Sequence, residues 1–288
     1  MAHIRAERAD NVPMKSRIGA VMIVAALALA GCGGHGDEPD ATPSSKPTQA
    51  GTSPTQAPWQ ALDGPLGRCG PQPADVAEAG FAPTVLEDPD VGRIPAVTAG
   101  SGTTLAVLLH QTDGNGLCGW LAYAADLVAQ PGVQVLAIDM CGYGEARCKG
   151  DRSGPHQVDA VGVAVREARQ RLGATRVVVV GASMGGSVAL MTAATNPDVD
   201  AAVDLSGPVD WKGLEVVDGG RALEVPVLVA MADSEGEDEV TGAQSIVDQA
   251  PDGSRFEPAE SGHGYDLLLD ADAQPLPLAE TVASWIRG

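Results

Sequence analysis

The sequence predicts an α/β fold in which helices cover both faces of a mostly parallel sheet. Runs such as "TLAVLLH" (104–110) and "RVVVVGAS" (176–183) are apolar at nearly every position, which is typical of strands buried on both faces. These runs alternate with segments whose apolar residues recur at helical spacing. The chain has 288 residues, 44% hydrophobic but only 3% aromatic, which is enough for one sizeable core built from Val, Leu and Ala.

The individual elements follow from the same two patterns, taken in order along the chain. Strands are expected at 104–110, 133–139, 176–183, 199–207, 225–233 and 254–260. Helices are expected at 119–130, 156–173, 185–196, about 239–250, and 278–287. The helix at 156–173 ends at a glycine, a common helix stop. No internal repeat is evident.

Residues 1–31 have the features of a secretory signal peptide. Lys15 and Arg17 precede an apolar run that ends in small residues, and the run is shorter than the roughly 20 residues that a membrane span needs. The ending "LAGC" resembles the lipobox of bacterial lipoproteins, in which the cysteine is lipidated and becomes the first residue. We therefore expect an exported cell-envelope lipoprotein, anchored to the membrane through Cys32. The alternative is an ordinary signal peptide followed by a chance cysteine.

The mature chain divides into a tether and one domain. Residues 32–60 are rich in Pro, Gly, Ser and Thr and predict a flexible tether, and 61–288 form the folded domain. The formal charge is −20, and it becomes −22 without residues 1–31 because four basic and two acidic residues leave. This charge opposes binding to nucleic acid or to anionic lipid headgroups, so membrane attachment has to come from the lipid.

Four cysteines remain once Cys32 is assigned to lipidation. An even number in an exported chain predicts two disulfides, with three possible pairings. Cys141 and Cys148 enclose a short loop and are the natural local pair, which leaves Cys69 to pair with Cys118. The alternative is four free buried thiols.

Ser183 is the candidate nucleophile. It stands in the sequence Gly181-Ala182-Ser183-Met184-Gly185, directly after an expected strand and before an expected helix. That context is what a G-x-S-x-G nucleophile elbow requires, because glycines without a Cβ let strand and helix approach around a strained serine. The alternative is a glycine-rich chain reversal with no catalytic role.

A nucleophilic serine needs a base, and in this arrangement the base follows the serine in the chain. His263 meets that condition, and it lies between two glycines after the last expected strand. The acid that orients the imidazole is expected after strand 225–233, where Asp233, Glu235 and Asp238 are candidates.

From about residue 94 to its end, the chain resembles the α/β-hydrolase superfamily, and in particular a group of small bacterial members that are often lipoproteins. The resemblance is carried by "LLHQTDGNGLCGW", "AIDMCGYGEA", "GATRVVVVGASMGGSVAL", "DLSGP", "PVLVAMADSE" and "SGHGYDLL". The chain departs from the family pattern where Gln111 replaces the glycine that usually follows the histidine of the first stretch.

The resemblance implies an α/β-hydrolase fold and roles for specific residues. Counted from Pro226, the family spacing puts the acid at Glu235, with Asp233 as the close second. The oxyanion hole is expected to use the backbone N–H of Met184 and one from the loop after strand 104–110, at Gln111 or Thr112.

Taken together, these features predict a lipid-anchored serine hydrolase, similar to carboxylesterases, that cleaves small-molecule esters or related acyl bonds. Only about seventeen residues separate "DLSGP" from "VPVLV", too few for a helical lid, so no large lid domain is expected. No metal or organic cofactor is expected. Two alternatives remain: an inactive surface lipoprotein that binds ligands on the same fold, and an acyltransferase that acts on envelope substrates with the same residues.

Overall fold

The structure is a computed structural model, and it describes residues 59–112, 115–150, 153–216 and 222–288. The expected signal peptide at 1–31, the lipidation site Cys32 and nearly all of the tether at 32–60 lie outside the described residues. The first described element begins at Gln60.

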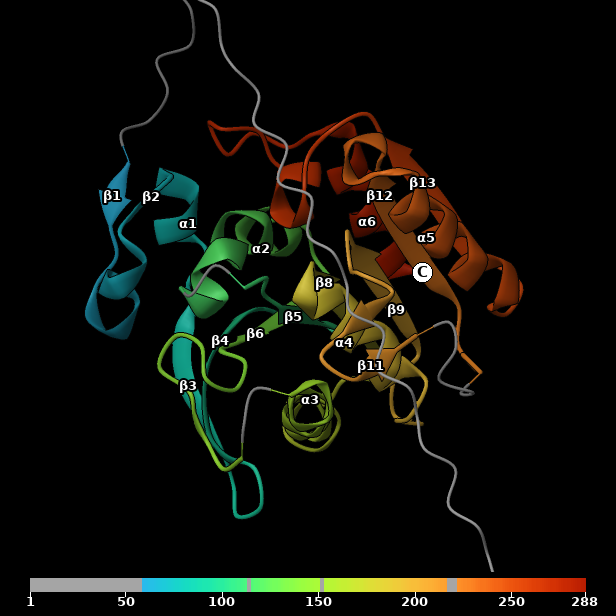
Figure 1. Cartoon of the computed structure of the whole chain (residues 1–288). Helices are drawn as coiled ribbons and strands as arrows, with labels where there is room; N and C mark the ends of the chain where they lie inside the picture. Colours follow the sequence, from blue (N-terminus) through green and yellow to red (C-terminus); the bar gives the residue numbers. More distant parts are fainter. Residues whose placement is uncertain (1–58, 113–114, 151–152, 217–221) are drawn as a thin grey trace, which may run out of the picture. The chain divides into compact units, whose positions relative to one another are not determined.

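A single large sheet organises the fold (Figure 1). Its strands follow the order β13-β12-β9-β8-β5-β6-β4-β3, and β7 pairs with β4. The strands from β13 to β6 along this path are mutually parallel, whereas β4 runs antiparallel to both β6 and β3. The bounds of the sheet strands are β3 Ala82–Asp88, β4 Gly92–Gly100, β5 Thr104–Leu109, β6 Val133–Ile138, β7 Arg147–Cys148, β8 Arg176–Ala182, β9 Ala201–Leu205, β12 Val227–Ala232 and β13 Arg255–Ala259.

Helices cover both faces of this sheet. In the view of Figure 1, α2 and α3 lie on opposite sides of it. One core packs α2 and α6 against the sheet, and the other packs α3, α4 and α5. The bounds are α1 Ala74–Glu78, α2 Leu121–Val128, α3 Gly154–Gln170, α4 Met184–Ala193, α5 Glu237–Gln249 and α6 Pro277–Arg287, with short 3₁₀ helices η1 Gly64–Cys69, η2 Gly116–Trp120, η3 Asp233–Glu235 and η4 Gly264–Leu267.

Strand β8 illustrates why the apolar runs become central strands. Val178 and Val180 point into the first core, and Val177 and Val179 into the second, and all four are fully buried. Because successive side chains of a strand face opposite sides, a strand between two helical layers must be apolar at every position. The predicted α/β class and α/β-hydrolase arrangement are therefore confirmed, as are the predicted strands and helices from residue 104 onward.

The sequence did not predict the antiparallel edge formed by β3 and β4. Strand β3 is mostly exposed, and β4 contains Pro95 between Gly92 and Gly100, which are residues that usually argue against a strand. Both form because β4 pairs with β6 along Ala96–Gly100 and shields that side of the parallel sheet. Two further pairs are short: β1 (Gln60–Ala61) with β2 (Pro71–Gln72), and β10 (Asp210–Trp211) with β11 (Leu214–Glu215).

Both expected disulfides are present. The structure pairs Cys69 with Cys118 and Cys141 with Cys148, with Cα–Cα distances of 5.2 and 5.4 Å. The first joins η1 to η2, and the second closes the loop after β6. Within the described part of the chain, no helix is long and apolar enough to span a bilayer.

Candidate active site

The sheet order brings the predicted site residues to one edge. Strand β5 pairs with β6 on one side and with β8 on the other, so the chain changes direction across the sheet at this point. In open α/β sheets, ligand sites form at the carboxyl ends of strands beside such a switch. Strand β5 leads into Gln111 and Thr112, and β8 leads into Ser183. Two of the predicted elements of the site therefore extend from neighbouring strands.

Ser183 adopts a strained backbone conformation. Its φ of 51° and ψ of −120° lie outside the regions that residues with a Cβ normally adopt, a conformation that costs about 1–3 kcal/mol. The two glycines of the motif make the turn possible. A Cβ at Gly181 would lie 1.9 Å from the carbonyl oxygen of Gly185, and a Cβ at Gly185 would lie 2.2 Å from that of Leu109. The serine itself is partly exposed, so a substrate can reach it.

Glu235 and His263 are in direct contact. The Nδ1 atom of His263 lies 2.6 Å from Oε1 of Glu235. Glu235 ends η3, immediately after β12, and His263 caps η4, after β13. Of the described carboxylates that the sequence offered, Glu235 makes this contact, and Asp233 and Asp238 make none with the imidazole.

The loop that carries His263 lies against the serine turn. A Cβ built on Gly264 would be 3.3 Å from the Cβ of Ala182, so the residue after the histidine abuts the residue before the serine. The histidine ring is 46% exposed and the Glu235 side chain 22%. The structure thus gathers Ser183, His263 and Glu235 at the same edge of the sheet, with the histidine accessible from solvent.

The expected oxyanion donors are not equivalent in the structure. Met184 is the first residue of α4, and the N–H groups of a helix's first turn have no acceptor within the helix. In the other loop, the Gln111 N–H already donates to the Tyr265 hydroxyl at 3.0 Å. That bond favours Thr112 over Gln111 as the second donor.

His110, which directly follows β5, has a structural role. It is fully buried, and the loss of solvation lowers its pKa to about 4, so the ring is neutral. Its Nε2 accepts the Met140 N–H at 2.9 Å, and its Nδ1 lies 2.6 Å from the carbonyl oxygen of Gln111. Because Nε2 accepts, the proton is on Nδ1 and is donated to that carbonyl. The ring joins the loops that follow β5 and β6.

Two buried aspartates at strand ends were missed by the sequence reasoning. Asp139 follows β6 and is paired with Arg68, whereas Asp204 lies within β9 behind the serine turn. Both are fully buried. In the sequence, each of them is a single carboxylate within or just after an apolar run. That pattern could have indicated a buried carboxylate with specific partners, because a buried charge requires them.

Asp204 is packed tightly against the backbone around α4. Its Oδ1 accepts the Gly207 N–H at 2.7 Å, and a Cβ on Gly186 would lie 1.9 Å from the same oxygen. Burial is the main cause that raises the pKa of this carboxyl to about 7, and the nearby charge of Glu239 adds to it. Among the described residues, the other oxygen of Asp204 has no hydrogen-bond partner, nor do Ser206 Oγ and Glu239 Oε2.

Within the described ranges, no group of three or more His, Cys, Asp and Glu side chains is placed to hold a metal ion.

Comparison with known proteins also indicates the α/β-hydrolase fold. A family model described as the alpha/beta hydrolase fold matches residues 107–226. An esterase of Pyrococcus furiosus is similar in structure, with a TM-score of 0.60 and 14% identity over 75% of this chain and 95% of that one. An esterase of Exiguobacterium antarcticum has a TM-score of 0.59 and 17% identity over 72% and 100%. A putative epoxide hydrolase of Pseudomonas aeruginosa has a TM-score of 0.53 and 17% identity over 72% and 95%. No curated protein matches in sequence.

Proposed function

Because the chain has the α/β-hydrolase fold and matches a model of that fold over residues 107–226, we propose that it is a serine hydrolase that cleaves carboxylic esters or related acyl bonds. The observation that carries the proposal is the 2.6 Å contact between Glu235 and His263, on a loop that abuts the strained turn of Ser183. A nucleophile, a base and a residue that orients the base are the minimum set for acyl transfer through a covalent intermediate.

In the proposed reaction, Nε2 of His263 removes the proton from Ser183 Oγ as that oxygen attacks the ester carbonyl carbon. Glu235 holds the proton of Nδ1, which fixes the tautomer and stabilises the imidazolium that forms. The N–H groups of Met184 and Thr112 bind the negative oxygen of the tetrahedral intermediate. The imidazolium then protonates the leaving alcohol, and an acyl-serine remains. Water, deprotonated by the same histidine, then attacks the acyl carbon. As this second tetrahedral intermediate collapses, the bond to Ser183 Oγ breaks, the imidazolium returns its proton to that oxygen, and the acid leaves.

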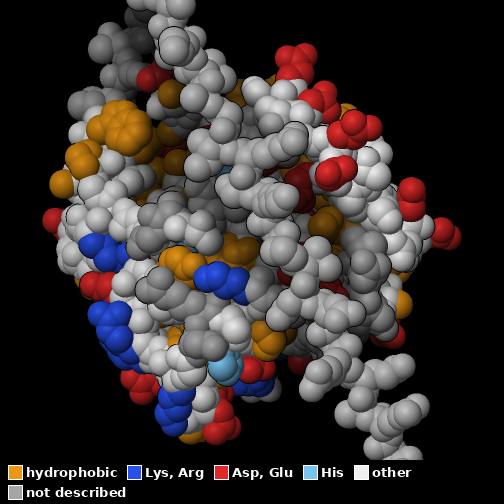
Figure 2. Space-filling view, viewed as in Figure 1, with side chains coloured by type: hydrophobic (Ala, Val, Ile, Leu, Met, Phe, Trp, Pro, Cys, Tyr) orange, Lys and Arg blue, Asp and Glu red, His pale blue; other side chains and the backbone are white. Residues whose placement is uncertain are grey.

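The segment between β9 and β12 favours a small, accessible substrate. Its described residues form only the short β10–β11 pair, and none of them is in a helix. Figure 2 shows acidic side chains gathered on the side of the molecule that holds α5 and β13, with Lys and Arg mainly on the side of β3 and α3. The first turn of α5 is acidic at Glu237, Asp238 and Glu239, close in sequence to Glu235. This charge disfavours anionic substrates, so we propose a neutral carboxylic ester.

Two experiments test the serine assignment. Ser183→Ala should abolish the hydrolysis of short p-nitrophenyl esters, and wild-type protein should be labelled at Ser183 by a fluorophosphonate. Retention of turnover within a few-fold of wild type in Ser183→Ala would exclude the proposed nucleophile. An unlabelled, inactive wild type would instead support a binding protein on the same fold.

The assignment of the acid is tested separately. Glu235→Gln should lower kcat by up to about 10⁴-fold, because the imidazole loses its charge partner and correct tautomer. Asp233→Asn is the matched control, since Asp233 is two residues away, exposed, and makes no contact with the histidine. It should change kcat by less than about threefold, because solvated surface charges contribute little. The reverse pattern would move the acid to Asp233.

We also propose that the protein is exported and anchored to the membrane through a lipid on Cys32. The lipobox-like sequence supports this, and so do the two disulfides, because such bonds persist in oxidising compartments. Two acyl chains on one cysteine are the number needed for stable anchoring. Cys32→Ser should therefore release the protein from the membrane fraction. Membrane association that survives this change would exclude Cys32 as the anchor.

A further inference from the structure

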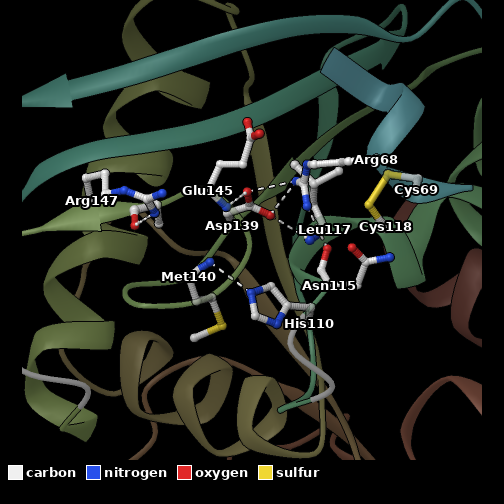
Figure 3. Close-up of polar contacts among 11 residues, drawn as sticks. Arg68, Cys69, His110, Asn115, Leu117, Cys118, Asp139, Met140, Glu145 and Arg147 are labelled. Atoms are coloured by element: carbon white, nitrogen blue, oxygen red, sulfur yellow. Dashed lines mark hydrogen bonds and ion pairs between the residues drawn. A yellow bond between two sulfur atoms is a disulfide. The ribbon is translucent and has the colours of Figure 1, made fainter. Parts of the chain in front are cut away.

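Arg68 connects the described segment before β3 to the loop after β5, by which we mean the connection between β5 and α2, η2 included. This residue lies in η1, 39 residues before the start of the family match at residue 107. Its Nη1 donates to the carbonyl oxygen of Asn115 at 2.8 Å, and its Nη2 lies 2.8 Å from each carboxylate oxygen of Asp139 (Figure 3). One guanidinium thus bridges the loop after β5 and the loop after β6.

Asp139 is the centre of this arrangement. Its carboxylate is fully buried and also accepts the N–H of Leu117 at 2.9 Å and that of Glu145 at 2.8 Å. The backbone approaches it so closely that a Cβ on Gly116 would lie 2.0 Å from its Oδ1, and one on Gly144 would lie 2.4 Å from either oxygen. A buried carboxylate needs a cation and several hydrogen bonds, and within the described residues Arg68 is the cation that pairs with it. Both loops therefore contact the carboxylate that Arg68 pairs with.

A covalent bond holds the same loop next to this ion pair. Cys69, which follows Arg68, forms the disulfide with Cys118. The loop is thus held at Asn115, Leu117 and Cys118 by groups that lie outside it. Figure 3 shows the disulfide beside the ion pair, and in this view the His110–Met140 contact lies below Asp139.

This loop contacts both the oxyanion side of the candidate site and the segment that follows His263. It starts at Gln111 and Thr112, where the second oxyanion donor is expected. Its far end packs on Tyr265, two residues after His263: a Cβ on Gly119 would lie 2.4 Å from the Tyr265 ring, and the rings of Trp120 and Tyr265 are 5.1 Å apart and nearly perpendicular. The Tyr265 hydroxyl in turn accepts the Gln111 N–H.

We propose that Arg68 is a positioning residue for the oxyanion side of the active site, acting through Asp139 and Asn115. This inference rests on the proposed serine hydrolase function. An oxyanion donor acts only on the charge that develops in the transition state, so a displaced loop lowers kcat and leaves substrate binding unchanged. A displacement of about 1 Å can cost on the order of 100-fold. Loss of Arg68 should therefore lower kcat by about 10- to 100-fold, with KM within about twofold of wild type.

The test compares Arg68→Gln with Arg169→Gln. Arg169 is a control of similar exposure: its side chain is 21% exposed against 19% for Arg68, and it also pairs with a carboxylate, that of Asp200, and donates to the backbone carbonyl of Asp198. Its partner Asp200 is 37% exposed, whereas Asp139 is fully buried, so kcat is compared per molecule of folded enzyme. Asp200 directly precedes β9, so this second pair lies at the amino ends of the strands, opposite Ser183. Equal losses of kcat in the two variants would show that Arg68 contributes only to stability and would overturn the proposal.

Three further measurements make the outcomes distinguishable. Ser183→Ala is assayed in parallel to test the proposed function. If the wild type hydrolyses esters no faster than this variant, the proposed function is overturned and the role of Arg68 is not yet decided. In that case, hydrogen exchange of the Leu117 amide decides: faster exchange in Arg68→Gln than in Arg169→Gln supports positioning of the loop, and equal exchange overturns it.

If Arg68→Gln does not fold, Arg68→Lys is used, since lysine keeps the charge beside Asp139 but lacks the fork that also reaches Asn115. It should show the same selective loss of kcat, and a wild-type kcat would overturn the proposal.

Discussion

Asp204→Asn should make the protein less sensitive to alkaline pH. The wild-type carboxyl is fully buried, and its pKa is raised to about 7 from 3.8, mainly by burial. The amide of asparagine has the same shape, keeps the oxygen that accepts the Gly207 N–H, and never ionises. The substitution therefore removes the ionisation and preserves the hydrogen bond.

The sign and size of the effect follow from this pKa. Between the unfolded value of 3.8 and about 7, the folded protein holds a proton that the unfolded chain has lost. Stability therefore falls as pH rises through this window, and the full penalty is reached above the folded pKa. For these two values, the wild type should lose about 2 to 3 kcal/mol between about pH 5 and about pH 8 through this one carboxyl. The neighbouring Glu239 contributes to the raised pKa, so Glu239→Gln should reduce the loss in part.

Urea unfolding of wild type and Asp204→Asn at several pH values measures this effect. The pH dependence that all other titrating groups give to the free energy of unfolding is the same in both proteins, so it cancels in the difference between them. The stability of the variant relative to wild type should increase by about 2 to 3 kcal/mol from about pH 5 to about pH 8. A difference that is constant over this range, or that moves in the opposite direction, would refute a proton on Asp204 at neutral pH.

Three other substitutions have definite expected outcomes. Gly181→Ala should destabilise the fold or abolish ester hydrolysis, because its Cβ would lie 1.9 Å from the Gly185 carbonyl oxygen; a stable and active variant would contradict the geometry of the turn. Gly162→Ala should stabilise the protein by about 0.5–1 kcal/mol in thermal unfolding, because this glycine lies inside α3 and an added Cβ would come no closer than 3.9 Å to another residue. Tyr123→Phe should cost about 1–3 kcal/mol in urea unfolding, since the buried hydroxyl donates to the Ala279 carbonyl at 3.0 Å; no change would mean that water replaces it.

The sequence was sufficient for the parallel part of the fold because those strands are buried on both faces. Apolar runs of this kind have few other structures open to them, and their alternation with helices determines a parallel sheet. It was insufficient for β3 and β4, where exposure, Pro95 and glycine conceal the strand pattern. At the site, residues in motifs could be predicted, and the structure brings Glu235 to His263. Arg68 could not be predicted, because its partner Asp139 is 71 residues away and no spacing rule relates them.

The end of β9 connects the buried Asp204 to the candidate nucleophile. The strain at Ser183 persists only if the surroundings fix its backbone, and its N–H donates to the carbonyl of Leu205 at 2.8 Å. Leu205 follows Asp204 directly, and on the α4 side the hydroxyl of Ser187 donates to the Pro208 carbonyl at 2.6 Å. Asp204 lies between these two contacts, and its Oδ1 is so close to the backbone that a Cβ on Gly186 would lie 1.9 Å from it and one on Gly207 2.4 Å. We therefore expect ionisation of this buried carboxylate to displace the adjacent backbone, which also holds Ser183. The pH at which Asp204 destabilises the protein should then also be the pH at which the serine turn becomes less well ordered.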